Sequence, residues 1–319
     1  MHSMTHEKRY EDLRLGRMSE HTRAFMKIQD GCDQFCTYCI IPYTRGRVRS
    51  RDLSDIRAEA RALAANGCQE VVLTGIHLDS YGTDLPEGDL LTAIRAVAEV
   101  GGIRRIRLGS LEPRIMTEAF VRELASVEKL CPHFHLSLQS GCDETLRRMN
   151  RKYDTQEFRA CCERLRTYFD HPALTTDVMV GFPGETEEEF SQTVRFLEGL
   201  QFYEMHVFKY SRRKGTRADR MEGQISEPVK TRRSDALLKL TGEQSLAYRK
   251  RLIGKTVEVL MEEAYERDGI TYQVGHTGEY VKIAVAEETS LSNRMELVKV
   301  EKLLENDVLC GVLTNADRK

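Results

Sequence analysis

Strand-like and helix-like segments alternate along residues 24–210, and this alternation restricts the fold more than any other feature. Short apolar segments predict six strands, at 24–30, 70–76, 103–111, 133–139, 174–182 and 203–211. Segments with helical spacing of apolar residues predict helices at 53–67, 90–102, 117–128, 143–150, 155–169 and 186–200. Repeated strand–helix units form parallel sheets with right-handed crossovers. We therefore expect an α/β domain, built either as a barrel or as an open sheet.

Polar residues and glycines follow the predicted strands. In both architectures the chemistry takes place at the carboxyl ends of the parallel strands. The residues of this kind that we single out after the second to fifth predicted strands are Gly75, Glu112, Gln139 and Gly181. We expect them to lie at one rim of the domain.

Three cysteines follow the first predicted strand, in the segment GCDQFCTYC with the spacing Cys32-x3-Cys36-x2-Cys39. Three cysteines can hold three irons of a cubane cluster and leave the fourth iron open to a substrate or cofactor. A structural zinc site would need a fourth nearby ligand, usually from a second C-x2-C pair, and this chain has no second pair. The spacing favours a cluster over a degenerate zinc knuckle or three buried cysteines.

The expected cellular compartment determines whether the nine cysteines of the chain stay reduced or form disulfides. The first twenty residues are polar and lack the apolar region of a signal peptide. No stretch approaches the roughly 18 apolar residues of a membrane span. We therefore expect a cytoplasmic protein without a membrane partner. Its cysteines should stay reduced there, so a group of them indicates metal binding or catalysis rather than disulfides.

The cysteine spacing, with Tyr38 just before the last cysteine, resembles the signature of the radical S-adenosylmethionine (SAM) superfamily. The resemblance implies a partial (β/α)6 barrel and one [4Fe–4S] cluster whose open iron chelates SAM. It makes the three cysteines both metal ligands and catalytic residues. The cofactor-binding residues that it implies are Tyr38, Gly75 and Gly181. Glu112 and Gln139 are further candidates for cofactor binding, because their place at the rim suits hydrogen bonds to the cofactor's ribose or carboxylate.

Longer segments resemble one branch of that superfamily. The segments VVLTGIHLDSYG, RIRLGSLEP, HLSLQSGCDETLRRMNRKY and TTDVMVGFPGETEEEF are similar to the core of the tRNA methylthiotransferases. LTGIH looks like the branch that acts on N6-threonylcarbamoyladenosine beside the anticodon. The implied partners are the tRNA anticodon stem-loop and an electron-donor protein. Two alternatives stay open: a tRNA-binding radical SAM protein without sulfur transfer, and a radical SAM enzyme with another substrate.

A change of pattern after residue 228 predicts a second module. A long helix at 228–251 is followed by short alternating segments with glycine turns, and this tail resembles the RNA-binding TRAM domain. We expect a linker at 1–22, a radical SAM core at 23–248 and a TRAM-like domain at 249–315. The net charge is only −2, but residues 204–251 hold thirteen Lys or Arg against six acidic residues. Such a segment suits phosphate contacts, and the candidates for RNA binding are Arg212, Arg213, Lys214 and Arg217.

The chain departs from the family at its amino terminus. The family normally begins with a domain that carries three further cysteines for a second cluster, and no cysteine precedes Cys32 here. We therefore interpret the chain as a fragment or truncated form. We expect it to cleave SAM and bind tRNA but to insert little sulfur alone.

Overall fold

The computed structural model describes residues 22–305 and 307–314, so the expected linker lies outside the described residues except for its last residue. Two sheets precede the long helix α8. The first has the order β2-β1-β3-β4, with β1 (Arg23–Asp30), β2 (Arg49–Ser50), β3 (Glu70–Gly75) and β4 (Arg105–Leu108). The second has the order β5-β6-β7, with β5 (His133–Gln139), β6 (Ala173–Val180) and β7 (Glu204–Lys209).

The pairing confirms the predicted partial barrel. β1 pairs with β3, β3 with β4, β5 with β6, and β6 with β7, all in parallel. Two parallel bridges, Ile106–Leu130 and Leu111–Leu136, join the two sheets. Six parallel strands therefore follow one another in chain order from β1 to β7. The short β2, which the sequence did not predict, pairs antiparallel with the end of β1.

Apart from the short helix at Ile41–Thr44, which the sequence analysis did not predict, the helices lie within a few residues of their predicted bounds. They are α1 (Ile41–Thr44), α2 (Leu53–Ala65), α3 (Leu90–Ala98), α4 (Glu118–Ala125), α5 (Asp143–Arg148), α6 (Thr155–Tyr168) and α7 (Glu187–Leu200). The capping box predicted for α7 is present, because Thr186 and Glu189 each accept a hydrogen bond from the other's backbone N–H. A cap of this kind stabilises a helix by about 1 kcal/mol.

The main core lies between the sheets and their helices. Along β1, Met26 and Ile28 are fully buried and pack in one apolar cluster with helix residues such as Ile56. The intervening Phe25 is 56% exposed, because alternate strand residues point to opposite faces. On β7, Phe208 is likewise 53% exposed. Both phenylalanines thus lie on the face of the curved sheet that the helices do not cover.

A closed five-stranded barrel forms the second module. Its strands are β8 (Thr256–Arg267), β9 (Ile270–Thr277), β10 (Lys282–Ala286), β11 (Met295–Leu303) and β12 (Val308–Leu313), in the order β10-β12-β11-β8-β9. The strands approach each other closely at Gly275, where an added Cβ would lie 2.1 Å from the carbonyl oxygen of Leu260. Only glycine fits there without a shift of the backbone.

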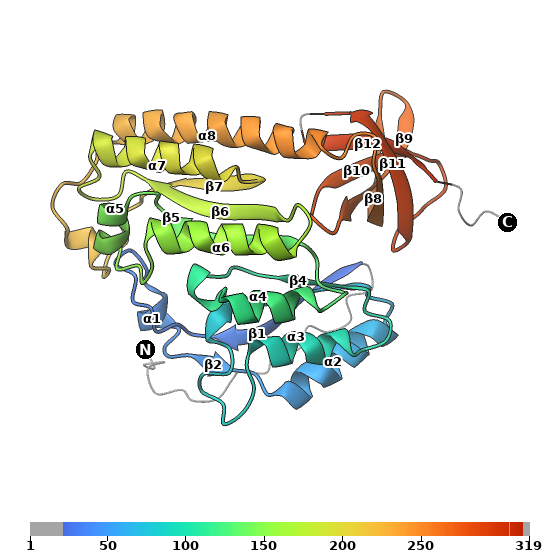
Figure 1. The fold of residues 1–319 in the computed structure, drawn as a ribbon, viewed down its shortest axis with the longest axis horizontal. Coiled ribbons are helices and arrows are strands. Elements are labelled where there is room, and N and C mark those ends of the chain that lie inside the picture. The colour runs from blue at the N-terminus through green and yellow to red at the C-terminus, as the bar shows by residue number, and fades with distance from the viewer. Residues whose placement is uncertain (1–21, 306, 315–319) are drawn as a thin grey trace.

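The barrel docks on the amino ends of the parallel strands. Arg23, the first residue of β1, donates to Glu262 Oε1 at 2.8 Å, and Arg105, the first residue of β4, donates to the Glu258 carbonyl oxygen at 2.8 Å. Figure 1 shows the barrel at one end of the sheets and α1 and α5 at the other. The carboxyl ends of the strands are therefore left clear of the barrel.

Helix α8 (Glu227–Lys250) runs along α7 and β7 toward the barrel (Figure 1). With 24 residues it is about 36 Å long. Its exposed Leu238 lines a groove of about 580 Å³ between α8 and β7. This groove lies away from the cysteine loop and does not contain the predicted site residues.

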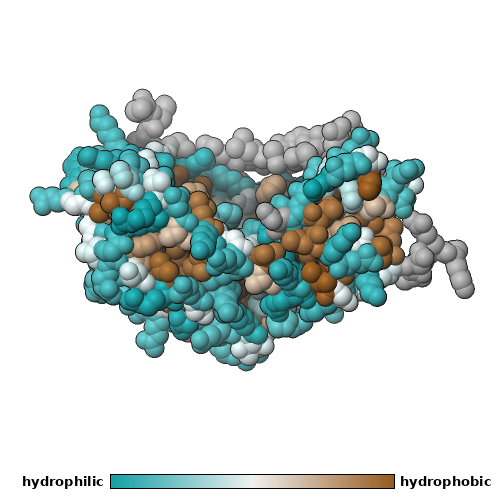
Figure 2. All heavy atoms as spheres, turned by 90° about the horizontal axis from the view of Figure 1, so that it is seen from above, coloured by the Kyte–Doolittle hydropathy of each residue, from teal (hydrophilic) through white to brown (hydrophobic). Residues whose placement is uncertain are grey.

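The outer surface is mainly hydrophilic where it is seen from the α8 side. Figure 2 shows two separate patches of hydrophobic side chains on that side, divided by hydrophilic residues. Within the described ranges, no helix has the length and apolar character needed to cross a membrane.

Candidate functional site

The cysteine loop begins where β1 ends, and glycine is required at its first position. Gly31 has a φ of +71°, and a Cβ there would lie 1.8 Å from the Arg47 carbonyl oxygen. Its N–H donates to Asp30 Oδ1 at 2.8 Å, and the next N–H, of Cys32, donates to the Gly46 carbonyl oxygen at 3.1 Å. The loop is thus fixed against the segment that leads into β2.

The other side of the loop is fixed by the end of α5. Thr37 donates through its N–H to the Met149 carbonyl oxygen and through its hydroxyl to the Arg148 carbonyl oxygen, each at 3.0 Å. Asn150 Nδ2 donates to the Phe35 carbonyl oxygen at 2.9 Å. Because the loop is held by the segment before β2 on one side and by the end of α5 on the other, folding of the whole domain sets its conformation.

The three thiols are partly or fully buried. Cys32 is buried, and Cys36 and Cys39 are half-buried. Burial raises the pKa of Cys32 to about 11 and also raises the pKa of Cys39. These two thiols would remain protonated at neutral pH without a cation, and metal ligation deprotonates a thiol. The loop therefore suits metal-bound thiolates better than free reactive ones.

The spacing of the sulfurs distinguishes between kinds of metal centre. In the described part of the chain, the three donor atoms found within 4.8 Å of one another belong to His77, Asp79 and Glu112, and not to the cysteines. A tetrahedral zinc ion with Zn–S bonds of about 2.3 Å holds its sulfurs roughly 3.8 Å apart. The three cysteine sulfurs do not all lie within 4.8 Å of one another, so they are spread more widely than the sulfurs around one zinc ion.

Arg151 connects the loop to the rim of the sheet. Its Nη1 donates to Cys36 Sγ at 3.1 Å, and its Nη2 donates to Glu112 Oε1 at 2.7 Å. Tyr38 OH lies 3.5 Å from the same Nη1. Arg151, for which we predicted no role, therefore brings together Glu112 and Tyr38, which were predicted separately as site residues.

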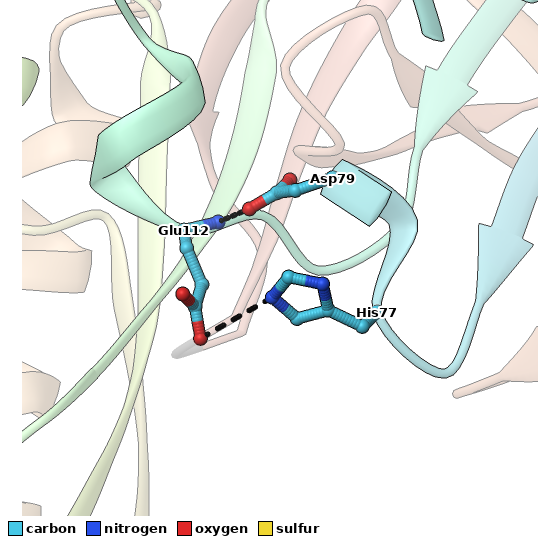
Figure 3. A group of neighbouring side chains, drawn as sticks. All are labelled: His77, Asp79 and Glu112. Atoms are coloured by element: carbon cyan, nitrogen blue, oxygen red, sulfur yellow. Dashed lines mark hydrogen bonds and ion pairs between the residues drawn. The ribbon is translucent and has the colours of Figure 1, made fainter. Parts of the chain in front are cut away.

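Glu112 also joins a small acid–histidine group (Figure 3). Its Oε1 lies 3.5 Å from His77 Nε2, and its N–H donates to Asp79 Oδ2 at 2.6 Å. Burial acts to raise the pKa of Glu112, but His77 and Arg151 outweigh it and lower that pKa. Burial raises the pKa of Asp79 to about 7. Glu112 is thus held as a carboxylate, with one oxygen between His77 and the Arg151 guanidinium.

Gly75, at the end of β3, packs directly on Gln29. An added Cβ at Gly75 would lie 2.8 Å from Gln29 Oε1. Gln29 is fully buried, accepts from the His77 N–H at 2.8 Å and donates to the Gly31 carbonyl oxygen at 2.8 Å. This glutamine links the turn after β3 to the cysteine loop, and the sequence analysis did not identify it.

The remaining predicted cofactor residues lie along the same rim. Gln139 closes β5 with a φ of +71°, and Gly181 follows β6 with a φ of +70°. A Cβ at Gly181 would lie 2.3 Å from Lys230 Cγ of α8. The ring of Phe182, the next residue, packs edge-on against Tyr38 with centroids 6.4 Å apart. The structure therefore brings the strand-end residues toward the cysteine loop.

The predicted RNA-binding residues lie in the loop that follows β7. Arg213, Lys214 and Arg217 are exposed, and the charge of Arg213 acts on Cys39. Arg212 is exposed too but pairs with Asp219 at 3.1 Å. The loop adjoins the cysteine loop, because Ala218 N donates to the Thr37 carbonyl oxygen at 2.8 Å.

Three of the thirteen basic residues in the wider segment face inward. Within 204–251, Lys230, Arg233 and Arg249 are buried and pair with Glu227, Glu185 and Glu204. The count of charges along the sequence therefore overstates the basic surface. The exposed cations beside the cysteine loop are therefore the candidates for contacts with RNA phosphates.

Comparison with known proteins identifies the family. The model of the radical SAM superfamily matches residues 26–197. The threonylcarbamoyladenosine tRNA methylthiotransferase MtaB of Thermotoga maritima is 37% identical over 91% of this chain and 70% of its own length. The chain belongs to the radical SAM methylthiotransferase family. The corresponding Bacillus subtilis protein is 38% identical, over 92% of this chain and 65% of its own length.

A relative with a different stated substrate is equally similar. The tRNA-2-methylthio-N(6)-dimethylallyladenosine synthase of Desulfitobacterium hafniense is 41% identical over 75% of this chain and 54% of its own length. The chain thus spans about half to two thirds of several of these radical SAM relatives.

Solved structures agree on the fold. Coproporphyrinogen III oxidase of Escherichia coli, a radical SAM enzyme, superposes with a TM-score of 0.54 at 15% identity, over 92% of this chain and 72% of its own. The radical SAM methyltransferase TsrM of Kitasatospora setae gives 0.53 at 18% identity, over 61% and 38% of the two chains. Family membership supports an iron–sulfur cluster and SAM as the cofactors.

Proposed function

We propose that this chain carries the radical SAM chemistry of a tRNA methylthiotransferase that converts N6-threonylcarbamoyladenosine, beside the anticodon, to its 2-methylthio form. The observation that carries the proposal is the loop of Cys32, Cys36 and Cys39, fixed from both sides at the carboxyl ends of the parallel strands. This rim is where β/α domains place their reacting groups.

The residues of the chain have distinct roles in this proposal. The three cysteines would hold one [4Fe–4S] cluster, which when bound supplies the electron that cleaves SAM. Gln29 and Gly75 hold the turn beside the loop in a single close-packed arrangement. Glu112 and Gln139 present side-chain oxygens for hydrogen bonds to SAM, Gly181 leaves room for close approach of the backbone, and Tyr38 supports this part of the loop.

The RNA would enter over the face of the sheet that the helices leave open. Phe25 and Phe208 expose about half of their surface there, and unstacked RNA bases bind by stacking on aromatic side chains. The exposed cations Arg213, Lys214 and Arg217 lie beside the cysteine loop and suit phosphates. Arg212 would have to exchange Asp219 for a phosphate.

The two modules have separate roles in this proposal. We propose residues 23–248 as the radical SAM core and residues 249–315 as a TRAM-like domain that contacts the anticodon stem-loop. The choice of threonylcarbamoyladenosine rests on the LTGIH turn after β3. An electron-donor protein and a cytoplasmic location complete the proposal.

The test uses anaerobically reconstituted protein. We expect about four irons per chain and cleavage of SAM to 5′-deoxyadenosine after reduction, both lost in C32A, C36A and C39A. Cys310→Ala, in the barrel, is the matched control and keeps both. Nucleosides from tRNA with and without N6-threonylcarbamoyladenosine are then analysed by mass spectrometry.

Each result separates the proposed function from its alternatives. A 2-methylthio product from the threonylcarbamoylated tRNA alone supports the full proposal. SAM cleavage and tRNA binding with little of that product match the expectation that this chain alone inserts little sulfur, and complete absence of the product favours a tRNA-binding radical SAM protein without sulfur transfer. SAM cleavage without tRNA binding favours another substrate, and a loaded protein that does not cleave SAM refutes the radical assignment.

A further inference from the structure

Arg151 is a buried guanidinium with each of its three nitrogens engaged. Its side chain is only 6% exposed. Besides Cys36 Sγ at 3.1 Å and Glu112 Oε1 at 2.7 Å, it donates from Nε to Tyr153 OH at 2.9 Å and from Nη2 to the Ser137 carbonyl oxygen at 3.3 Å. A buried charge is tolerated when it is paired and its donors are satisfied. The planar fork of arginine allows these contacts to fix its orientation.

This fixed orientation aims one N–H at a proposed cluster ligand. Glu112 and Tyr153 hold the guanidinium independently of the cysteine loop, because they lie after β4 and before α6. The N–H toward Cys36 is therefore placed by the fold of the sheet rather than by the sulfur itself. Hydrogen bonds to the sulfurs and the local charge both set the reduction potential of an iron–sulfur cluster.

We infer that Arg151 is a positioning residue that holds the Cys36 thiolate and raises the reduction potential of the cluster bound there, while Glu112 opposes it. Reduction adds one electron to the site, and a nearby cation stabilises the added negative charge. Glu112 carries a negative charge next to the same guanidinium, so it acts with the opposite sign. The reduction potential of the cluster therefore depends on the balance between the positive charge of Arg151 and the negative charge of Glu112.

The Glu112 carboxylate has a second partner besides Arg151. His77 Nε2 lies 3.5 Å from the same Oε1 that accepts from Arg151. This contact holds Glu112 in place when Arg151 is replaced, so the carboxylate remains near the cluster. Loss of Arg151 should therefore leave an uncompensated negative charge and shift the potential downward.

The experiment measures the midpoint potential of the cluster by electron paramagnetic resonance during stepwise reduction with dithionite, a one-electron donor, without SAM or tRNA. The variants are R151M, R151K and E112Q. R148M is the matched control, because Arg148 lies three residues earlier and pairs through both Nη atoms with Glu189, at 2.8 and 2.6 Å. Iron content and thermal unfolding are recorded for each protein.

We expect R151M to lower the potential enough to reduce the reduced-to-oxidised ratio at least tenfold at a fixed potential, which equals about 59 mV for one electron. E112Q should shift it upward, R151K should restore more than half of the loss, and R148M should match the wild type. A general loosening of the loop would not give opposite signs in R151M and E112Q.

The inference rests on the proposed cluster site, and the readouts separate the two. Wild-type protein without iron would overturn both. Shifts of the same sign in R151M and E112Q, or equal potentials in R151M and R148M, would overturn the role of Arg151 and leave the cluster site standing. If R151M does not retain iron, R151K and E112Q decide the question by the sign of their shifts.

Discussion

Glu70 on β3 and Arg107 on β4 form a buried ion pair across two parallel strands, with Oε1 and Nε 3.0 Å apart. Glu70 is fully buried, and Arg23 Nε donates to the same oxygen at 2.5 Å. The ring of Tyr280, from the barrel, lies 4.6 Å from the Arg107 guanidinium and 4.9 Å from that of Arg23. One buried carboxylate thus organises the contact between the sheet and the barrel.

Replacement of Glu70 by Gln should destabilise the protein by about 3–5 kcal/mol, because the change leaves buried arginines without their anion. Urea unfolding followed by circular dichroism measures this difference. Glu258→Gln is the control, because that side chain is 46% exposed where it pairs with Arg105, and it should cost less than about 1 kcal/mol. A similar loss of unfolding free energy in both variants would contradict the role of Glu70 as the buried anion between the sheet and the barrel.

Stability should also depend on the ionisation of Glu70 in acid. Burial acts to raise its pKa, but Arg107 and Arg23 outweigh burial and lower the pKa to about 2, from an ordinary 4.5. A depressed pKa gives stability that is fully present above pH 4.5 and is lost as the pH falls toward 2. The loss is on the order of 3 kcal/mol. Urea unfolding at pH 7, 4.5 and 3 should therefore show a steeper decline for the wild type than for E70Q, and parallel declines would refute this.

Gly75→Ala should impair SAM cleavage more than stability. The new Cβ would lie 2.8 Å from Gln29 Oε1 and 2.9 Å from Gln29 Cβ, so the glutamine must move. Overpacking costs about 1–3 kcal/mol, while misplacement of a site by about 1 Å can cost a hundredfold in rate. Rates of 5′-deoxyadenosine formation should fall at least tenfold. Gly101→Ala, where a Cβ meets nothing within 4 Å, should change neither property.

Removal of the exposed cations Arg213, Lys214 and Arg217 should weaken binding of an anticodon stem-loop and reduce its dependence on salt. The slope of log affinity against log salt should become shallower by about one unit for each phosphate that the protein no longer neutralises. Fluorescence anisotropy at several salt concentrations gives this slope. R232A/K239A is the control, because those cations pair with Glu187 and Glu243. An unchanged slope in the triple variant would place the RNA elsewhere.

The regular elements were predictable because their periodicity reflects burial. Met26 and Ile28 face the helices, and the polar Lys27 between them makes this alternation visible in the sequence. The apolar Phe25 points to the open face and does not follow the alternation. The strand β2 was missed because Arg49–Ser50 is two residues long and polar. Its formation depends on pairing with the end of β1, which a local pattern does not reveal.

The site was predictable only in part, because local sequence patterns do not show contacts between residues that lie far apart in the chain. The cysteines are close in sequence, so their spacing alone indicated a metal centre. Arg151 lies 115 residues from Cys36 and 39 from Glu112, and only the fold brings them together. Gln29 was overlooked because an amide within a strand has no distinctive pattern.

The barrel contacts the amino ends of the parallel strands, and the cysteine loop follows the carboxyl end of β1. Docking therefore sets a fixed distance between the barrel contact and the cysteine loop. β1 has eight residues, which at about 3.3 Å each separate its docked end from the cysteine loop by about 26 Å. A single nucleoside cannot reach across that gap, whereas a folded stem-loop can. If the barrel grips RNA as proposed, only a substrate that spans this distance binds both modules, and a free nucleoside lacks the binding energy of the barrel contact.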